Sequence, residues 1–485
     1  MADPAATLVS DSRRTRSNRP RPNRTAGLLL AAVAGLAALG VGFVRTAGGL
    51  AGPGSDVAAG ASAATSAQCA GPSANIAASG CVRPSTPAGS NRSAAAASPR
   101  PSAPPAPGSS ASPGPPVVGS ASERLASRLQ ATLDRLRAKL AIPGVSATIL
   151  LPDGTTWTGV SGFADVASRT AVAPDTAFAF ASVSKTFTSA LIIELIDEGT
   201  LRLTDSAASL LPRLPIALDR RITVAMLLNH TSGLPDYFLN PKIDGALQSR
   251  PTAAWPVERT LGYVGKRLSA PGAAWHYANT NYLLLGLIAE RATGESLADA
   301  IRTRLLEPVG LTTTWYQAEE PAGSNLAHGY RFASTKLTAR PIDLDDGSGT
   351  APFRSVVTAA GGAGSMAGTS EDLARWARAL YSGKVLGPAG TAILLSGFRP
   401  TANYLPGVAY GYGVQALTID GHASLGHSGR LLGFRSAVRH FPIDGLTIVV
   451  LTNQSRVDPG LIVRALLAVA VPAETPTTPN LPRRD

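Results

Sequence analysis

The sequence predicts an α/β protein of the α+β type, in which helices flank an antiparallel sheet and a mostly helical subdomain is attached. Two observations lead to this prediction. Strand-like segments lie at both ends of the region after residue 119, and the middle of that region follows helical periodicity or turn chemistry. Because each element must bury its apolar face against another, the simplest packing is a sheet that joins the two ends, with helices inserted between them.

The first predicted elements form a helix, a hairpin and a second helix. Five leucines recur at helical spacing between residues 125 and 140, which indicates an amphipathic helix. Apolar runs at 145–151 and 155–160 flank Pro152-Asp153-Gly154, a typical hairpin signal. Residues 182–198 predict a helix that ends at Gly199.

The last predicted elements are three strands and a closing helix. Residues 413–419, 433–440 and 446–452 have strand-like patterns, with a turn at 442–445 between the last two. Residues 458–471 predict a helix, and a Pro/Thr-rich flexible tail follows at 473–485. These patterns place the folded domain at 119–472.

The N-terminal region has the pattern of an exported protein. A basic tail at 1–24 precedes residues 25–44, which carry no charge and are long enough to cross a bilayer. Because the arginines come before the apolar run, we expect the tail in the cytoplasm and the rest outside. Residues 25–44 are either a transmembrane anchor or a cleaved signal, so the protein is expected in the cell membrane as a single-pass protein, or secreted.

Residues 45–118 consist largely of Ala, Ser, Pro and Gly and are predicted to be a disordered linker, because they offer little apolar surface to bury. Both cysteines, Cys69 and Cys81, lie in this stretch. A disulfide between them and two free thiols remain alternative interpretations.

The formal net charge of +12 does not indicate a nucleic-acid partner. Residues 1–118 contain ten Arg and three Asp, which accounts for +7 of that charge outside the predicted domain. After residue 119 no run of Lys and Arg is interleaved with aromatic residues, so we expect no nucleic-acid binding. No Cys/His group has metal-ligand spacing, and no cofactor is expected.

Ser182 and Lys185 form the first candidate chemical motif. They stand three residues apart in a predicted helix, so the two side chains share a face. A serine hydroxyl needs a neighbouring base to become a nucleophile, and burial lowers the pKa of a lysine toward that task. The sequence contains six lysines, and Lys185 is the only one in a Ser-x-x-Lys pattern.

A second motif is Tyr277-Ala278-Asn279, which lies between the turn at Pro271-Gly272 and an apolar helix. A phenol and an amide two residues apart on an irregular segment can face one cavity. The phenol can relay a proton, and the amide can bind a carbonyl or an amine. Taken alone, this pattern is more typical of an ordinary core tyrosine and a turn asparagine.

The third motif is His427-Ser428-Gly429, followed by Arg430, between strand-like segments. A glycine at such a place permits close approach of another backbone, such as that of a substrate. Taken alone, this segment fits a polar loop with a hydrogen-bonded histidine better than a chemical motif.

The order and spacing of the three motifs resemble the Ser-x-x-Lys, Tyr-x-Asn and Lys/His-x-Gly motifs of the serine β-lactamase and D-alanyl-D-alanine carboxypeptidase superfamily, including class C β-lactamases and penicillin-binding proteins. The segments 230–235, 279–286, 360–374 and 433–434 are similar to that superfamily as well. The resemblance extends over residues 122–472.

The resemblance implies a β-lactamase/transpeptidase-like fold and an exported serine hydrolase. Ser182 would be acylated, and Lys185 and Tyr277 would share the proton transfers, with the general base undecided between them. Asn279 would bind the substrate and steady the lysine.

The resemblance also gives the third motif a role. His427 would assist by hydrogen bonding, and Ser428, Gly429 and Arg430 would bind the substrate, with the backbone N–H groups of Ser182 and Arg430 as an oxyanion hole. A neutral imidazole offers less positive charge to a β-lactam carboxylate than the lysine of efficient β-lactamases.

The sequence therefore favours a carboxypeptidase-like peptidase or an esterase that acts on small molecules or peptides, such as peptidoglycan stem peptides. A β-lactamase, a weakly catalytic penicillin-binding or cell-wall sensing protein, and a tethering module are the alternatives. An α/β-hydrolase is disfavoured because the sequence contains no Gly-x-Ser-x-Gly.

Overall fold

The computed structural model describes residues 120–334, 336–401 and 406–471. The predictions for 1–24, 25–44, 45–118, the two cysteines and the tail 473–485 lie outside the described residues. None of the helices in the described ranges is both long and apolar enough to cross a membrane.

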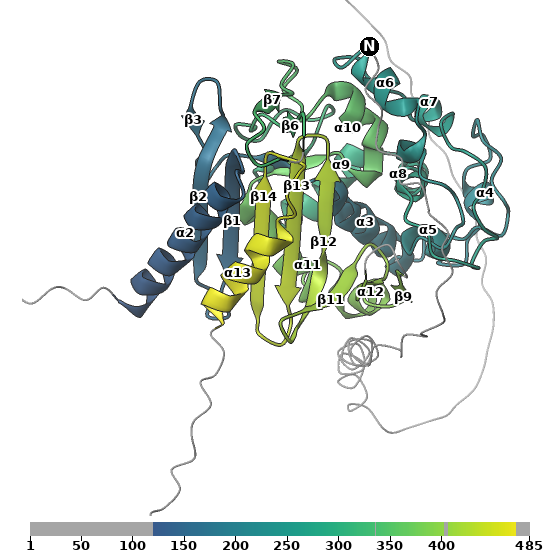
Figure 1. Ribbon diagram of the computed structural model, residues 1–485. Coiled ribbons are helices and arrows are strands. Elements are labelled where there is room, and N and C mark those ends of the chain that lie inside the picture. The colour runs from purple at the N-terminus through teal and green to yellow at the C-terminus, as the bar shows by residue number, and fades with distance from the viewer. Residues whose placement is uncertain (1–119, 335, 402–405, 472–485) are drawn as a thin grey trace, which may run out of the picture. The chain divides into compact units, whose positions relative to one another are not determined.

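Nine strands of the described chain form one antiparallel sheet that joins the two ends of the domain (Figure 1). The two ends meet where β1 pairs with β14, with Val145 opposite Thr452. In spatial order the strands are β3 (Thr170–Ala171), β2 (Thr156–Asp165), β1 (Gly144–Leu150), β14 (Leu446–Thr452), β13 (Phe434–Phe441), β12 (His422–Leu431), β11 (Gln415–Ile419), β10 (Ala409–Tyr410) and β9 (Arg399–Pro400).

Helices cover both faces of this sheet (Figure 1). On one face lie α2 (Ala121–Lys139) and α13 (Gly460–Ala470), whose buried leucines and isoleucine pack against β1, β13 and β14. On the other face α11 (Ser370–Tyr381) hydrogen-bonds into the sheet, because Ser370 Oγ lies 2.8 Å from Ser146 Oγ and 2.7 Å from Thr148 Oγ1. The larger core lies on this second side, between the sheet and the helical subdomain.

The helical subdomain is inserted between β4 (Phe178–Ala179) and β8 (Met366–Gly368). These two strands pair with each other, and β8 also pairs with β5 (Thr314–Tyr316), so the three form a small sheet. Its buried centre is formed by α3 (Lys185–Asp197) and α8 (Asn279–Thr293). Its other helices are α4 (Ala207–Leu210), α5 (Val224–Leu228), α6 (Ile243–Gln248), α7 (Val257–Leu261), α9 (Leu297–Ile301) and α10 (Arg354–Ala360), whereas α12 (Gly387–Leu394) follows β8 in the chain.

Short turns and one small ribbon complete the described chain. The turns are η1 (Ala181–Ser184), η2 (Tyr237–Leu239), η3 (Arg302–Leu306), η4 (Glu307–Val309) and η5 (Gly361–Ala363). The ribbon pairs β6 (Tyr330–Phe332) with β7 (Pro341–Asp343).

The predicted fold class, the N-terminal helix, the first hairpin, the last two strands with their turn and the closing helix are confirmed. The sheet does join the two ends of the domain, with the helical subdomain inserted between them.

Three local predictions need correction. The predicted helix at 182–198 is divided, since the 3₁₀ turn η1 carries Ser182 and α3 begins only at Lys185. Asn279 is not on an irregular segment but opens α8, whose preceding residue Ala278 has no capping side chain to signal the start. The third motif lies within strand β12 rather than between strands, because its glycines and polar residues weaken the alternation that predicts a strand.

Candidate active site

Ser182 lies at a sharp turn between a buried strand and a buried helix. Strand β4 leads into Ala181, which has a positive φ of 52°, an uncommon value for a residue other than glycine. The 3₁₀ turn η1 follows, and because residues i and i+3 eclipse in such a turn, Ser182 and Lys185 still share a face. Ser182 is half-buried, whereas its neighbours Ala181 and Val183 are buried.

Two functional groups meet the hydroxyl of Ser182. Lys185 Nζ lies 3.1 Å from Ser182 Oγ, and the Tyr277 hydroxyl donates to the same oxygen over 2.9 Å. The structure therefore brings the first two predicted motifs together, although 95 residues separate Ser182 from Tyr277.

Lys185 is fully buried behind the serine. Besides Ser182, its Nζ contacts Asn279 Oδ1 at 2.7 Å and the carbonyl oxygen of Ala363 at 2.7 Å. Burial lowers the pKa of this amine to about 7, and the carboxylate of Asp236 opposes part of that effect. The lysine can therefore lose or gain a proton near neutral pH.

Asn279 links Lys185 to Asp236. Its Oδ1 accepts from Lys185, and its Nδ2 donates to Asp236 Oδ2 over 2.8 Å. These two partners fix the orientation of the amide, because an ammonium can only donate and a carboxylate accepts. Burial raises the pKa of Asp236, while the backbone N–H of Phe238 favours the ionised form.

His427 lines the same space but does not hydrogen-bond to Ser182. Its Nδ1 lies 2.7 Å from the carbonyl oxygen of Ser428, so Nδ1 carries a proton. Its Nε2 then accepts from the hydroxyl of Tyr410 over 2.9 Å. Burial, and next the charge of Lys185, lower the pKa of His427 to about 3, so the imidazole is neutral.

Gly429 permits a close approach, but the partner is the protein itself. A Cβ atom at this position would lie 2.4 Å from the carbonyl oxygen of Phe180 and 2.2 Å from Ser436 Oγ. We expected the glycine to admit a substrate backbone, whereas the structure fills that space with the turn before Ser182. The glycine thereby lets β12 pack directly against the nucleophile turn.

The outer edge of β12 is open beside Ser182. Strand β11 pairs with β12 as far as Gln415 opposite Gly426, and within the described ranges no strand pairs with the outer edge from His427 to Leu431. Ser428 on this edge is half-buried and Arg430 is exposed. An edge of this kind presents backbone N–H and C=O groups that a bound chain can pair with.

A cleft of about 720 Å³ contains this open edge and the serine. Seven of the eight predicted site residues line it, and Lys185 lies buried behind them. Asp236 and Asp244 add acidic groups to the lining. The lining also includes apolar side chains, those of Phe238, Leu239, Leu247, Val356, Leu431 and Leu432.

Sequence reasoning missed several groups in this site. Asp236, Tyr410 and the carbonyl of Ala363 each contact a predicted residue, yet none of them belongs to one of the three motifs. Asp236 directly follows the segment 230–235, which had been noted for its resemblance, so that neighbourhood was the available signal. A lone tyrosine such as Tyr410 carries no comparable signal.

The family model described as Beta-lactamase matches residues 129–471, which is more than half of the chain. The chain belongs to the β-lactamase family. It is accordingly a serine hydrolase with the fold of penicillin-binding proteins and β-lactamases.

Individual members of the β-lactamase family are similar over most of the described chain. Penicillin-binding protein 4 of Amycolatopsis lactamdurans is 29% identical over 341 residues, covering 67% of this chain and 84% of that protein. D-aminopeptidase of Gluconobacter oxydans is 26% identical over 381 residues, covering 73% of this chain but 65% of that protein. D-amino acid amidase from Ochrobactrum anthropi SV3, solved with D-phenylalanine, superposes with a TM-score of 0.61 at 26% identity and covers 71% of this chain and 98% of its own.

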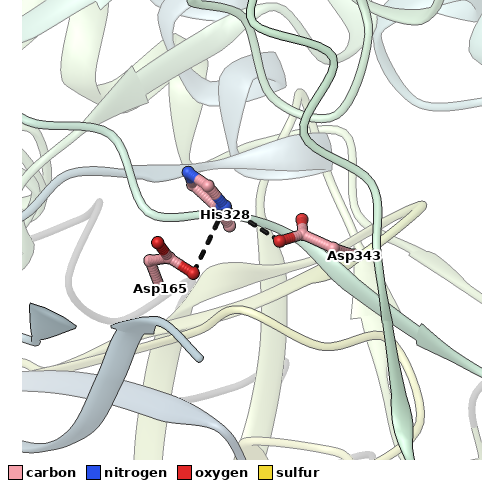
Figure 2. A group of neighbouring side chains, drawn as sticks. All are labelled: Asp165, His328 and Asp343. Carbon is pink, nitrogen blue, oxygen red and sulfur yellow. Dashed lines mark hydrogen bonds and ion pairs between the residues drawn. The ribbon is translucent and has the colours of Figure 1, made fainter. Parts of the chain in front are cut away.

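A second group of polar side chains consists of Asp165, His328 and Asp343 (Figure 2). His328 Nδ1 lies 3.0 Å from Asp343 and 3.8 Å from Asp165, and its Nε2 lies 3.8 Å from Asp345. Burial alone would lower the pKa of His328, but the hydrogen bond and charge of Asp343, with the other carboxylates, raise it above its usual value. We interpret the group as an ion-pair cluster on the protein surface.

Proposed function

We propose that this protein hydrolyses amide or ester bonds through an acyl-enzyme on Ser182. The observation that carries the proposal is the set of three contacts around Lys185 Nζ. Two of them end on carbonyl oxygens, of Asn279 and Ala363, which can only accept. A neutral amine would use its two N–H bonds there, so its lone pair would point at Ser182 Oγ.

In this proposal Lys185 is the general base for acylation. Ser182 Oγ bonds the substrate carbonyl carbon as its proton moves to Lys185 Nζ, and the bond from that carbon to the leaving nitrogen or oxygen then breaks. Tyr277, which hydrogen-bonds Ser182 Oγ, relays the proton to the leaving group. In deacylation, water gives a proton to the Lys185–Tyr277 pair as its oxygen bonds the acyl carbon. The bond from that carbon to Ser182 Oγ then breaks, and the proton returns to Oγ.

The strand edge and the nucleophile turn supply the remaining parts. The backbone N–H groups of Ser182 and Arg430 are the proposed oxyanion donors, since the first turn of a helix leaves its N–H groups unpaired and the open edge of β12 does the same. Asn279 keeps one amide N–H for the substrate while its other two contacts hold Lys185 and Asp236. Ser428 and Gly429 are proposed to bind the substrate along the open edge of β12.

The proposed substrates are peptides or amides with a D-residue at the scissile bond, with esters as simple surrogates. The names of the similar proteins, D-aminopeptidase and D-amino acid amidase, support the D-configuration. Similarity to penicillin-binding protein 4 supports peptidoglycan stem peptides as one source. The neutral His427 argues against efficient β-lactam hydrolysis, since it offers no cation to a β-lactam carboxylate.

Intact mass spectrometry tests the proposal. The full chain is incubated with a fluorescent penicillin, a short-chain nitrophenyl ester and a matched pair of D- and L-phenylalanine amides. We expect a covalent penicillin adduct on the Ser182 peptide, turnover of the ester and preference for the D-amide. An adduct without any ester or amide turnover would instead support a penicillin-binding protein with little catalysis. Absence of an adduct and of turnover would contradict the proposal.

We also propose that the catalytic domain is exported, on the evidence of the basic tail and the apolar segment 25–44. A reporter that is active only in the cytoplasm, fused after residue 118, should be silent. Strong reporter activity would refute export.

A further inference from the structure

His230 occupies an unusual backbone position beside the proposed site. It follows α5 and has a positive φ of 62°, although it is not a glycine. The side chain is fully buried. Its backbone oxygen accepts a hydrogen bond of 2.9 Å from the N–H of His276. The residue before Tyr277 is therefore tied to the His230 backbone.

The imidazole of His230 holds Tyr277 from the other side. Its Nδ1 accepts from the backbone N–H of Ala278 over 3.2 Å, and Nδ1 also lies 2.9 Å from Asn281 Nδ2. The imidazole packs on the Tyr277 ring, with the ring centroids 4.4 Å apart. Both neighbours of Tyr277 and its ring thus contact the same histidine.

These contacts determine the protonation of His230. Because Nδ1 accepts from two donors, the proton is on Nε2, and among the described residues this buried Nε2 has no hydrogen-bond partner. Burial, with the charge of Lys185, keeps the pKa of His230 well below its usual value, so the ring stays neutral. A positive φ and an unpaired buried N–H are both unfavourable, and features of this kind concentrate where function requires them.

We propose that His230 is a positioning residue that holds the Tyr277 hydroxyl on Ser182 Oγ, through the bond from Ala278 N–H to Nδ1 and through ring packing. The inference rests on the proposed function, in that Tyr277 relays the proton of Ser182. His230 is not itself one of the residues that line the cleft, whereas Tyr277, on which it packs, lines the cleft and contacts Ser182 Oγ, so His230 acts through Tyr277.

Two isosteric substitutions test the role of Nδ1. His230→Asn places an amide oxygen near the position of Nδ1, whereas His230→Gln places its amide near Nε2 and leaves Ala278 N–H unpaired. The full chain is labelled with a rhodamine fluorophosphonate, in which Ser182 Oγ bonds phosphorus, fluoride leaves and the serine proton passes to the Lys185–Tyr277 pair. We expect kinact to fall less than about 10-fold for the Asn variant and about 100-fold for the Gln variant, because small misplacement of a reacting group has effects of that size. KI should stay within about 3-fold, since the cleft lining is unchanged.

A double-mutant cycle separates positioning from general stability. In a Tyr277→Phe background, His230→Gln should slow labelling by less than about 3-fold, since residues that act through one group are not additive. His440→Asn is the matched control, because His440 is also a buried neutral histidine but lies on β13 against α11. Its kinact should equal that of the wild type.

Equal labelling rates for His230→Asn and His230→Gln would overturn the role of Nδ1. If the effects of His230→Gln and Tyr277→Phe on the labelling rate were additive, the proposal that His230 acts through Tyr277 would be overturned. Should His230→Gln fail to fold by its melting curve, His230→Phe removes the same acceptor while keeping a ring, and the same loss is expected. A wild-type chain that labels but turns over no amide or ester would refute the proposed function and leave the His230 test intact.

Discussion

Tyr410 donates a 2.9 Å hydrogen bond to Nε2 of His427, and burial keeps this imidazole neutral in the wall of the cleft. Nδ1 of the same ring donates to the carbonyl oxygen of Ser428, so both nitrogens of His427 have protein partners. A histidine held in this way can orient the strand edge but cannot supply a cation to a substrate carboxylate.

His427→Lys should therefore raise β-lactam hydrolysis relative to ester hydrolysis. An ammonium at this position would add a positive charge near the serine, and we expect the ratio of the two kcat/KM values to rise by about 10-fold, the effect of one modest charge interaction. A melting curve controls for a packing defect. An unchanged or lower ratio in a folded variant would refute the charge argument.

Ser182→Ala should abolish covalent labelling and reduce turnover by several orders of magnitude, because it removes the proposed nucleophile from a unit that acts together. Ser184→Ala is the internal control. Ser184 Oγ accepts from Met366 N–H over 3.0 Å, on a different side of the turn, so its loss should cost about 1 kcal/mol of stability and leave labelling intact. Labelling that survives in the first variant and disappears in the second would show that the wrong serine has been assigned.

The pH dependence of kcat/KM should follow Lys185. Its pKa of about 7 means that the base form, and with it activity, is lost as the pH falls through 7. Asp236→Asn removes the carboxylate that raises this pKa, so the acidic limb should move to lower pH. Asp244→Asn, which also lines the cleft but does not act on Lys185, should leave the limb in place. A limb that does not move in Asp236→Asn would contradict the effect of the Asp236 charge on the pKa of Lys185.

Gly429→Ala should impair folding and labelling together. The added methyl would lie 2.4 Å from the Phe180 carbonyl oxygen, and β12 or the turn before Ser182 must shift to accommodate it. We expect a loss of about 1–3 kcal/mol in the free energy of unfolding, as for overpacked sites. Gly421→Ala is the control in the same hairpin, because no atom lies within 4 Å of its Cβ position, although its positive φ adds some strain. Equal stability of the Gly429 variant and the wild type would contradict the close packing.

His328→Asn should destabilise the protein more at pH 5.5 than at pH 8.5. The carboxylates raise the pKa of His328 in the folded protein above its pKa in the unfolded chain. His328 therefore adds its full share to the free energy of unfolding below the unfolded pKa, and this share is lost as the pH rises through the folded pKa. Because the cluster is partly exposed, the effect at pH 5.5 should be at most about 1 kcal/mol. His440 is the opposite case, since burial lowers its pKa to about 4. A lowered pKa makes the histidine less stabilising at low pH, so His440→Asn should reduce the free energy of unfolding more at pH 8.5 than at pH 5.5. Thermal melts at both pH values measure the two trends, and a larger cost of His328→Asn at pH 8.5 would contradict the assignment.

The sequence alone determined the elements with strong periodicity and the chemical types at the site. The leucines of α2, the apolar runs of β1 and β14 and the turn between β13 and β14 depend on local side-chain patterns, which a single segment displays in full. Ser182-x-x-Lys185, Tyr277-x-Asn279 and His427-Ser428-Gly429 are likewise short motifs whose order and spacing could be compared with a family.

Only the tertiary structure decided which other groups surround those motifs and which protonation state the motif residues adopt. His230, Asp236 and Ala363 lie in or directly after segments that resemble the family, but only the fold shows that they contact the three motifs, and Tyr410 reaches the site with no local signal at all. The lowered pKa of Lys185 comes from complete burial among α3, α8 and η5, and burial is a property of the packed core. Gly429 is the clearest case, because a glycine in a sequence permits close approach, while the fold alone decides that its neighbour is the Phe180 carbonyl.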